Sequence, residues 1–229
     1  MKIFLSSIIC ITICLNATAQ ERLALYGGAQ FTSAKYLIEG KVQETDYKKG
    51  FMGGLGLKVP LEKQLSFFPA VYYSLKGYKV TYNDNAFPPS ENALNNNTTI
   101  HVLDISPMLQ WDFTKTPSHV FFRLGPSIDV AFSGTETYDT LSTSGNINAV
   151  TQKMKFSYTS YGKISAAINM QLGYQAGGGF MVFAHYAYGI GSMNNADFGP
   201  RIVHRIAGLS VGWLFGGRKN RNPIPTPAP

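Results

Sequence analysis

Apolar and polar side chains alternate with a two-residue period over long stretches of this chain, and no other feature restricts its fold as strongly. In residues 164–175, Ile, Ala, Ile, Met, Leu and Tyr alternate with Ser, Ala, Asn, Gln, Gly and Gln, and residues 101–113, 120–132 and 207–215 repeat the pattern. This period places successive side chains on opposite faces of a β-strand, whereas an amphipathic helix requires a period near 3.6. The chain is therefore predicted to be all-β.

Four weaker segments of the same kind raise the predicted number of strands to eight. They lie at about 22–31, 50–59, 64–76 and 178–190. The connections are alternately long (32–49, 77–98, 133–161 and 191–203) and short (60–63, 114–118 and 176–177). Strands of about 9–11 residues, with tight turns at one end and long loops at the other, are typical of transmembrane β-barrels. We predict an eight-stranded antiparallel up-and-down transmembrane β-barrel with both termini on the periplasmic side.

The apolar alternates are predicted to face lipid and the polar alternates to face the lumen, because lipid offers the backbone no hydrogen bonds and only a closed sheet satisfies its own. A lipocalin, the other exported eight-stranded barrel, has an apolar interior and a charged exterior. In the clear apolar stripes the only titratable residue is His101, which favours the membrane barrel. Aromatic residues suited to the two membrane interfaces are Phe31, Tyr73, Trp111, Phe113, Tyr174, Tyr186, Tyr188, Trp213 and Phe215.

The N-terminus has the pattern of a secretory signal peptide, predicted to be residues 1–19. Lys2 is followed by the apolar run 3–15 and by the small-x-small site Ala17-Thr18-Ala19. Both cysteines of the chain, Cys10 and Cys14, lie inside this segment, so the mature chain would have no disulfide, no zinc–thiolate site and no cysteine nucleophile. Residues 20–217 form the predicted barrel domain, and the basic, proline-rich residues 218–229 form a predicted disordered periplasmic tail.

Three features resemble the small outer-membrane β-barrel proteins of Bacteroidota, a group that includes PorT-like proteins. They are the Thr-Ala-Gln end of the signal (18–20), the rhythm of the loops and the glycine-rich segment 50–57. The architecture is similar to that of OmpX and OmpA, and the resemblance covers residues 20–217. It implies the outer membrane of a Gram-negative bacterium, and PorT-like relatives are associated with a secretion system. Residues 208–215 resemble the signal read by the barrel-insertion machinery, although the chain continues to Pro229.

Large polar side chains are predicted to fill the lumen, because an eight-stranded barrel is just wide enough to be filled in this way. The predicted network consists of Lys58, Lys76, Asp104, Gln110, Arg123, Asp129, Asn169, Gln171 and His185. The short turn 114–118 places Asp104 opposite Asp129, and Gln110 opposite Arg123. Two facing carboxylates make either a proton or cation site, or part of a polar plug in which Lys76 or tyrosine hydroxyls satisfy them. A diffusion pore is not expected.

The long loops carry cations that we expect either to bridge lipopolysaccharide phosphates or to be simply solvated. These cations are Lys35, Lys41, Lys48, Lys49, Lys153 and Lys155. The second loop, with its run Asn95–Thr99, is predicted to be flexible. The tail is expected either to dock a periplasmic partner or to remain disordered. The net charge of +7 is modest and carries no argument for nucleic acid in an exported chain.

The metalloprotease motif His-Glu-x-x-His does not occur in the sequence, and the four histidines are scattered along it. We expect a non-enzymatic surface recognition or scaffolding protein without cofactor or metal. Its expected partners are outer-membrane lipid and lipopolysaccharide, the barrel-insertion machinery, and a periplasmic or secretion partner. One alternative is a PorT-like component of a secretion or envelope machine. The other is a small barrel enzyme acting on lipid or peptide, with a site formed by His101, His204, Asp84, Asp139 and Asp197.

Overall fold

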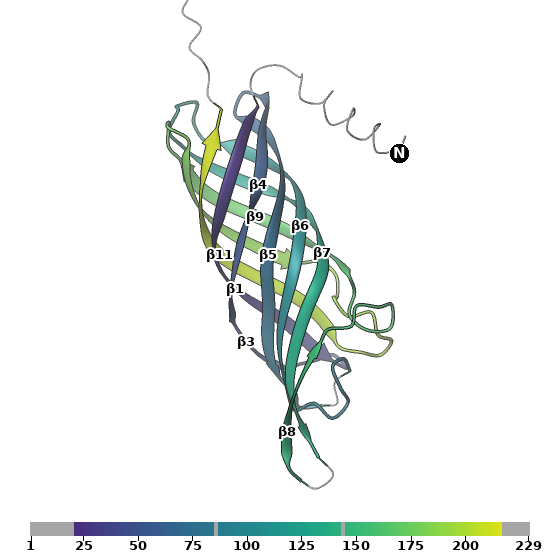
Figure 1. The fold of residues 1–229 in the computed structure, drawn as a ribbon. Helices are drawn as coiled ribbons and strands as arrows, with labels where there is room; N and C mark the ends of the chain where they lie inside the picture. Colours follow the sequence, from purple (N-terminus) through teal and green to yellow (C-terminus); the bar gives the residue numbers. More distant parts are fainter. Residues whose placement is uncertain (1–20, 85–86, 143–144, 217–229) are drawn as a thin grey trace, which may run out of the picture.

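The computed structural model describes residues 21–84, 87–142 and 145–216, and their long strands form a closed antiparallel barrel (Figure 1). Each strand pairs with its neighbour in the chain, and the last pairs with the first. This confirms the predicted eight-stranded ring. Its strands are β1 (Arg22–Ile38), β4 (Lys48–Glu62), β5 (Leu65–Thr81), β6 (Asn95–Asp112), β7 (His119–Leu141), β9 (Ile164–Gln175), β10 (Phe180–Gly189) and β11 (Arg201–Phe215).

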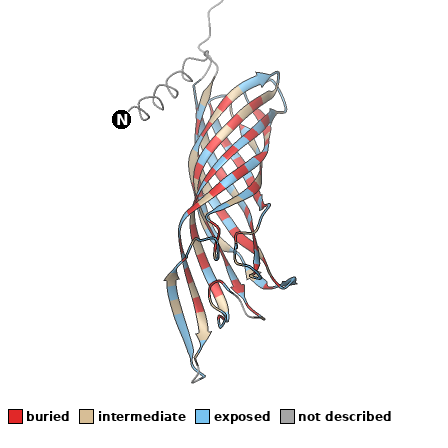
Figure 2. Ribbon diagram, turned by 90° about the vertical axis from the view of Figure 1, so that its right-hand side faces the viewer, coloured by how far each residue is buried: buried red, intermediate tan, exposed pale blue. Residues whose placement is uncertain are grey.

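Side-chain burial alternates along every strand of the ring, as the banding in Figure 2 shows. Many outward-facing apolar side chains are about half exposed, for example Ile128 at 53% and Leu209 at 66%. All nine aromatic residues predicted for the interfaces have this outward orientation. We call the outward-facing apolar side chains the apolar belt. An apolar exterior around a polar lumen is the reverse of a lipocalin, so that alternative is wrong.

The prediction that the long connections are loops is wrong for much of their length, because the structure shows β-sheet there. β1, β5 and β7 continue well past the apolar belt, and three short strands are added: β2 (Lys41–Val42), β3 (Glu44–Asp46) and β8 (Ile147–Lys153). β2 pairs with β1, β3 with β5, and β8 with β7 as a hairpin at the far end of Figure 1. We call the described parts of residues 32–49, 77–100, 133–163 and 190–206 the external extension.

The run Asn95–Thr99, predicted to be a flexible loop, is the first part of β6, so that prediction is wrong. Asn96 and Thr98 point inward and are buried, while their neighbours face outward. The error has a physical cause. Outside lipid the outer face of a sheet is solvated and carries polar residues, so the contrast between the two faces that marks a membrane strand is lost.

The interior has two layers of buried apolar side chains separated by charged groups. One layer, at the end of the barrel where β1 begins and β11 ends, includes Phe68, Met108 and Phe183. The other lies mainly in the external extension and includes Tyr36 and Tyr78. No helix long and apolar enough to cross a membrane is present in the described parts of the chain.

Glycines allow the narrow interior to close around the bulky lumen side chains. Gly54 on β4 faces inward beside Tyr72 of β5, and a Cβ atom added there would collide with the backbone and Cβ of Tyr72. Its neighbour Gly53 faces outward, and a Cβ atom there would make only an ordinary contact with the carbonyl oxygen of Tyr26, at 3.7 Å. Packing therefore requires glycine at the inward position 54, whereas a larger residue fits at the outward position 53.

Candidate functional site

Three charged side chains from three adjacent strands meet between the two apolar layers. Lys76 Nζ on β5 lies 2.6 Å from Asp104 Oδ1 on β6 and 2.8 Å from Asp129 Oδ2 on β7. Asp104 and Asp129 are direct cross-strand partners, in the register predicted from the 114–118 turn. The Ser127 hydroxyl donates to Asp129 Oδ1 at 2.7 Å. Lys76 thus occupies the space between the two carboxylates, which is the arrangement of a polar plug.

Arg123 is fully buried and contacts amides and aromatic rings instead of a carboxylate. Its Nε donates to Gln110 Oε1 at 2.7 Å and its Nη1 donates to Gln171 Oε1 at 3.0 Å. The guanidinium carbon lies 3.6 Å from the ring centroid of Phe68 and 4.3 Å from that of Phe121. These cation–π contacts and amide oxygens stabilise the charge where water is excluded.

A second charged cluster lies near the short turns. Lys58 Nζ lies 2.6 Å from Asp112 Oδ2, and His119 Nε2 lies 3.2 Å from Asp112 Oδ1. Gln110 Nε2 also donates to Asp112 Oδ1, at 2.5 Å, so this cluster is joined to Arg123. Asp112 and His119 were not among the predicted lumen residues. Asp112 lies two positions after Gln110, so the strand alternation was the signal that placed it on the inward face.

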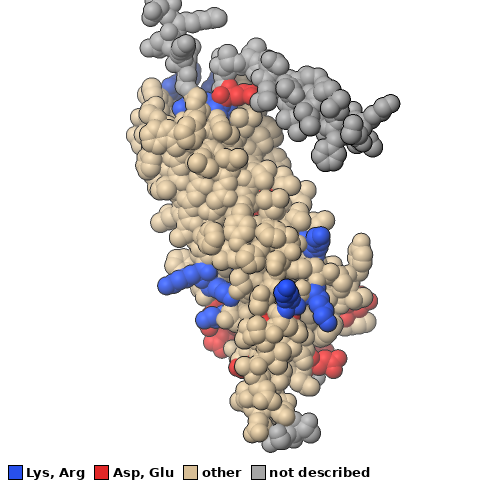
Figure 3. Space-filling model, viewed as in Figure 1, with Lys and Arg blue, Asp and Glu red and all other residues tan. Residues whose placement is uncertain are grey.

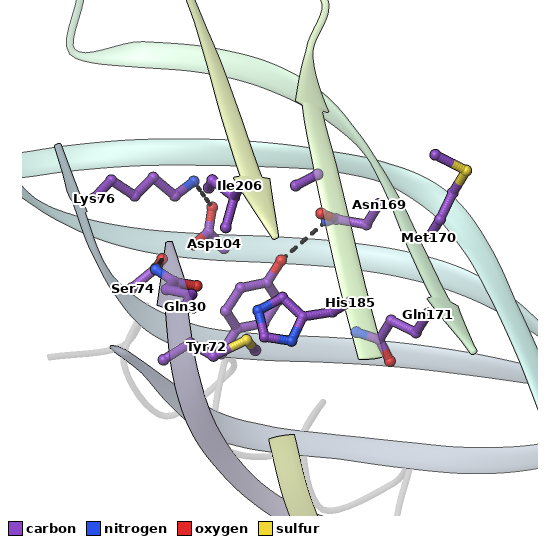
Figure 4. Close-up of a pocket in the computed structure, with 12 residues that line it drawn as sticks. Gln30, Tyr72, Ser74, Lys76, Asp104, Asn169, Met170, Gln171, His185 and Ile206 are labelled. Carbon is purple, nitrogen blue, oxygen red and sulfur yellow. Dashed lines mark hydrogen bonds and ion pairs between the residues drawn. The ribbon is translucent and has the colours of Figure 1, made fainter. Parts of the chain in front are cut away.

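The remaining predicted lumen residues make hydrogen bonds to other strands within the same interior (Figure 4). Asn169 Nδ2 donates to the hydroxyls of Tyr72 and Ser106, both at 3.0 Å. His185 Nδ1 lies 3.2 Å from Ser210 Oγ. All nine predicted lumen residues are therefore buried in the barrel interior.

The free space among these groups is small. A cavity of about 10 Å³ lies between side chains that include Lys76, Asp104 and His185 (Figure 4). Such a volume holds about one water molecule. The interior contains the three cations Lys58, Lys76 and Arg123 and the three carboxylates of Asp104, Asp112 and Asp129. The interior is therefore filled and electrically balanced, and it provides no water-filled passage.

The external extension is held together by its own core. Tyr36 lies against Tyr78 and Tyr82, with ring centroids 5.9 and 5.3 Å apart. Buried Glu136 accepts a hydrogen bond from the Tyr161 hydroxyl at 2.8 Å and one from Gln152 Nε2 of β8 at 2.9 Å. Burial raises the pKa of the Tyr161 hydroxyl well above its usual value, so this tyrosine remains a hydrogen-bond donor. The extension is therefore a packed, β-rich body.

The six predicted loop cations lie in three different surroundings. Lys41 forms an exposed ion pair with Asp84 at 3.2 Å. Lys48 lies beside Gly77 of β5, and its Nζ donates to Asn97 Oδ1 and Thr99 Oγ1 of β6, both at 2.6 Å. Burial and the neighbouring Lys79 lower the pKa of Lys48. The others lie on the outside of the extension: Lys35 and Lys49 near the apolar belt, and Lys153 and Lys155 on or beside β8.

The two histidines considered for catalysis do not converge. His101 faces outward on β6, where its Nδ1 lies 2.7 Å from the Tyr73 hydroxyl. His204 faces inward on β11, with its Nε2 2.9 Å from Met193 Sδ. Burial lowers the pKa of His204 to about 4, so its imidazole is neutral. The residues that the structure describes contain no group of three or more His, Cys, Asp or Glu side chains able to hold a metal ion.

Comparison with solved structures finds other small barrels. Ail, the attachment invasion locus protein of Yersinia pestis, is 10% identical over 86% of this chain and 100% of its own, with a TM-score of 0.44. OprG of Pseudomonas aeruginosa is 11% identical over 87% of this chain and 97% of its own, with a TM-score of 0.46. Neisserial surface protein A is 17% identical over 84% of this chain and 99% of its own, with a TM-score of 0.40. No curated protein matches the chain.

The family comparison is more informative than these structural similarities. The model of the family described as "Outer membrane protein beta-barrel domain" matches residues 18–195, which is more than half of the chain. The matched segment runs from before β1 to beyond β10 and so includes seven strands of the ring. This chain is therefore an outer-membrane β-barrel protein that belongs to the outer membrane protein beta-barrel domain family.

Proposed function

We propose that this protein is a non-enzymatic recognition or scaffolding protein of the cell surface, acting through its external extension. The observation that carries the proposal is the separate core of the extension, in which Tyr36, Tyr78 and Tyr161 are fully buried. An outer-membrane barrel needs only short connections to close its sheet. A packed body outside the lipid requires another reason, and presentation of a fixed surface to partners is the role that such bodies serve.

The filled lumen supports the same proposal by removing the competing role of conduction. Arg123 and the group formed by Lys76, Asp104 and Asp129 block the interior at two levels, and the remaining cavity holds about one water molecule. With the interior filled, the outside of the extension is the surface left for function.

Large apolar side chains on the extension supply contact surface for a partner. Tyr158 is 94% exposed, Tyr47 is 70% exposed, and Phe198 is fully exposed. All three lie in connections at the end of the barrel opposite the start of β1 and the end of β11. Aromatic side chains of this kind are enriched at interfaces because they contribute a large contact area with little loss of conformational entropy.

The finer expectations from the sequence remain predictions. The signal peptide, residues 1–19, and the tail, residues 218–229, lie outside the described residues. The PorT-like resemblance, a role in a secretion machine and a periplasmic partner therefore rest on the sequence alone. The enzymatic alternative gains no support from His101 and His204, which face opposite sides of the barrel wall.

The test compares intact cells that display the full-length protein with cells that display a variant carrying Tyr47→Ser, Tyr158→Ser and Phe198→Ser. Binding to arrayed surface glycans and proteins is measured, with Leu61→Ser as the control, at the end of β4 opposite the external extension. We expect at least one ligand whose binding requires the protein, is lost in the triple variant and persists in the control. Identical array patterns with and without the protein, or stepwise ion conductance of the purified protein in planar bilayers, would contradict the proposal.

A further inference from the structure

The outward face of the barrel changes from apolar to cationic where the external extension begins. On β4 the belt residue Phe51 is followed, one outward position further out, by Lys49. On β11 the belt residue Ala207 is followed in the same way by Arg205. Six cationic side chains of the external extension lie close to this boundary, and we call them the cationic collar: Lys35, Lys49, Lys79, Lys163, Arg201 and Arg205.

Most of the collar lies on four strands that are consecutive around the ring, β11, β1, β4 and β5. Lys49 is the cross-strand partner of Phe31 on β1, and Arg205 is the partner of Ser33, two residues further along β1. Because neighbouring strands are about 4.8 Å apart, these cations form a continuous arc. Figure 3 shows Lys and Arg side chains gathered where the uncharged wall of the barrel ends.

The collar cations take part in no ion pair within the described chain, in contrast to Lys41, Lys58 and Lys76. Asp46 of β3, the cross-strand partner of Lys79, is the nearest carboxylate by register. The Arg205 guanidinium lies 5.7 Å from the ring centroid of Tyr188, which faces outward. The opposite rim differs, because there the cations Arg22, Lys63 and Lys115 are mixed with Glu21 and Glu62.

We infer that the cationic collar binds the headgroup phosphates of a phosphorylated glycolipid in the outer leaflet of the membrane. The position next to the apolar belt places the cations where acyl chains end and headgroup phosphates begin. Lys and Arg are the side chains that bind phosphate, with Arg able to donate two parallel hydrogen bonds. Because the cations of the opposite rim are mixed with Glu21 and Glu62, the collar suits the outer leaflet. The inference needs only the outer-membrane location and is independent of the proposed recognition role.

Native mass spectrometry of the folded, full-length protein in detergent tests this inference. The probes are bisphosphorylated lipid A and the same lipid with both phosphates removed. The variant carries Lys49→Gln, Lys79→Gln, Arg201→Gln and Arg205→Gln, and the matched control carries Lys63→Gln and Lys115→Gln at the opposite rim. Heat-modifiable migration establishes that every variant is folded. Excess inorganic phosphate is added in a parallel series, to separate binding of a lipid from binding of the free anion.

We expect the wild type and the control to bind bisphosphorylated lipid A at least tenfold more tightly than the dephosphorylated lipid, since loss of one charge-assisted hydrogen bond alone corresponds to about tenfold. The collar variant should lose this preference while remaining folded. Equal binding of the two lipids by the wild type, or an unchanged preference in the folded collar variant, would overturn the inference. Complete displacement of lipid A by millimolar inorganic phosphate would also overturn it, because the site would then be one for the free anion.

Discussion

Replacing Lys76 with Met should be one of the most damaging single changes in the lumen. The substitution removes the ammonium group that lies 2.6 Å from Asp104 and 2.8 Å from Asp129 and leaves two buried carboxylates facing each other. Breaking one buried ion pair by removing a partner costs about 3–5 kcal/mol, because the other charge is left uncompensated. Here one ammonium serves two carboxylates. We therefore expect Lys76→Met to lower the free energy of unfolding by at least this amount, or roughly a hundredfold or more in the folding equilibrium.

The matched variant Asp104→Asn separates charge from packing. It leaves Lys76 paired with Asp129 and removes one of the two facing negative charges, so its cost should be clearly smaller than that of Lys76→Met. Adding Asp104→Asn to Lys76→Met should recover part of the lost stability, as a double-mutant cycle would show. Unfolding in urea from lipid vesicles, followed by fluorescence of Trp111 and Trp213, measures all of the variants. Equal losses for Lys76→Met and Asp104→Asn would refute the charge argument.

Three further predictions concern the wall and the extension. Gly54→Val should abolish the heat-modifiable folded band because its side chain would collide with β5, whereas Gly53→Val on the outward face should keep it; equal folding would contradict this explanation. Burial lowers the pKa of His204 to about 4, so the unfolded chain, with a pKa near 6.5, binds a proton that the folded protein excludes. The free energy of unfolding should therefore fall by up to about 3 kcal/mol as the pH drops from 6.5 to 4. A His204→Asn variant should lack this part of the pH dependence, and the same pH dependence in the variant and the wild type would contradict the prediction. Tyr161→Phe should cost about 1–3 kcal/mol, since Glu136 loses a buried donor; urea unfolding would show it, and no loss would mean that another donor replaces the hydroxyl.

The interior of the barrel could be predicted closely because its causes are local. A two-residue period assigns each side chain to the lumen or to lipid, and a short turn sets the register of the strands that it joins. The turn 114–118 thus placed Asp104 opposite Asp129, and Gln110 opposite Arg123, before any three-dimensional information. The same alternation also assigns Asp112, two positions after Gln110, to the lumen face.

The external extension could not be predicted in this way, because its pattern differs from that of a membrane strand. Asn96 and Thr98 are buried while Lys79 is exposed on the neighbouring strand, so polarity no longer indicates which face a residue occupies. These segments become ordered because a core forms between residues that are distant in the chain, such as Tyr36 and Tyr82. Local patterns do not reveal such packing.

The amino-acid sequence by itself determined the fold class, the order of the strands and the residues that face the lumen, since each depends on neighbours a few positions away. Only the tertiary structure decided which cations act together. Lys48 and Lys49 are adjacent in the chain, yet Lys48 reaches across β5 to hydrogen bonds with Asn97 and Thr99 of β6, whereas Lys49 lies opposite Phe31 of β1. Arg205 joins Lys49 in the collar only because β11 closes on β1, and β1 in turn pairs with β4. Closure of the ring brings the two ends of the sheet together, and no pattern along the chain specifies the surface that results.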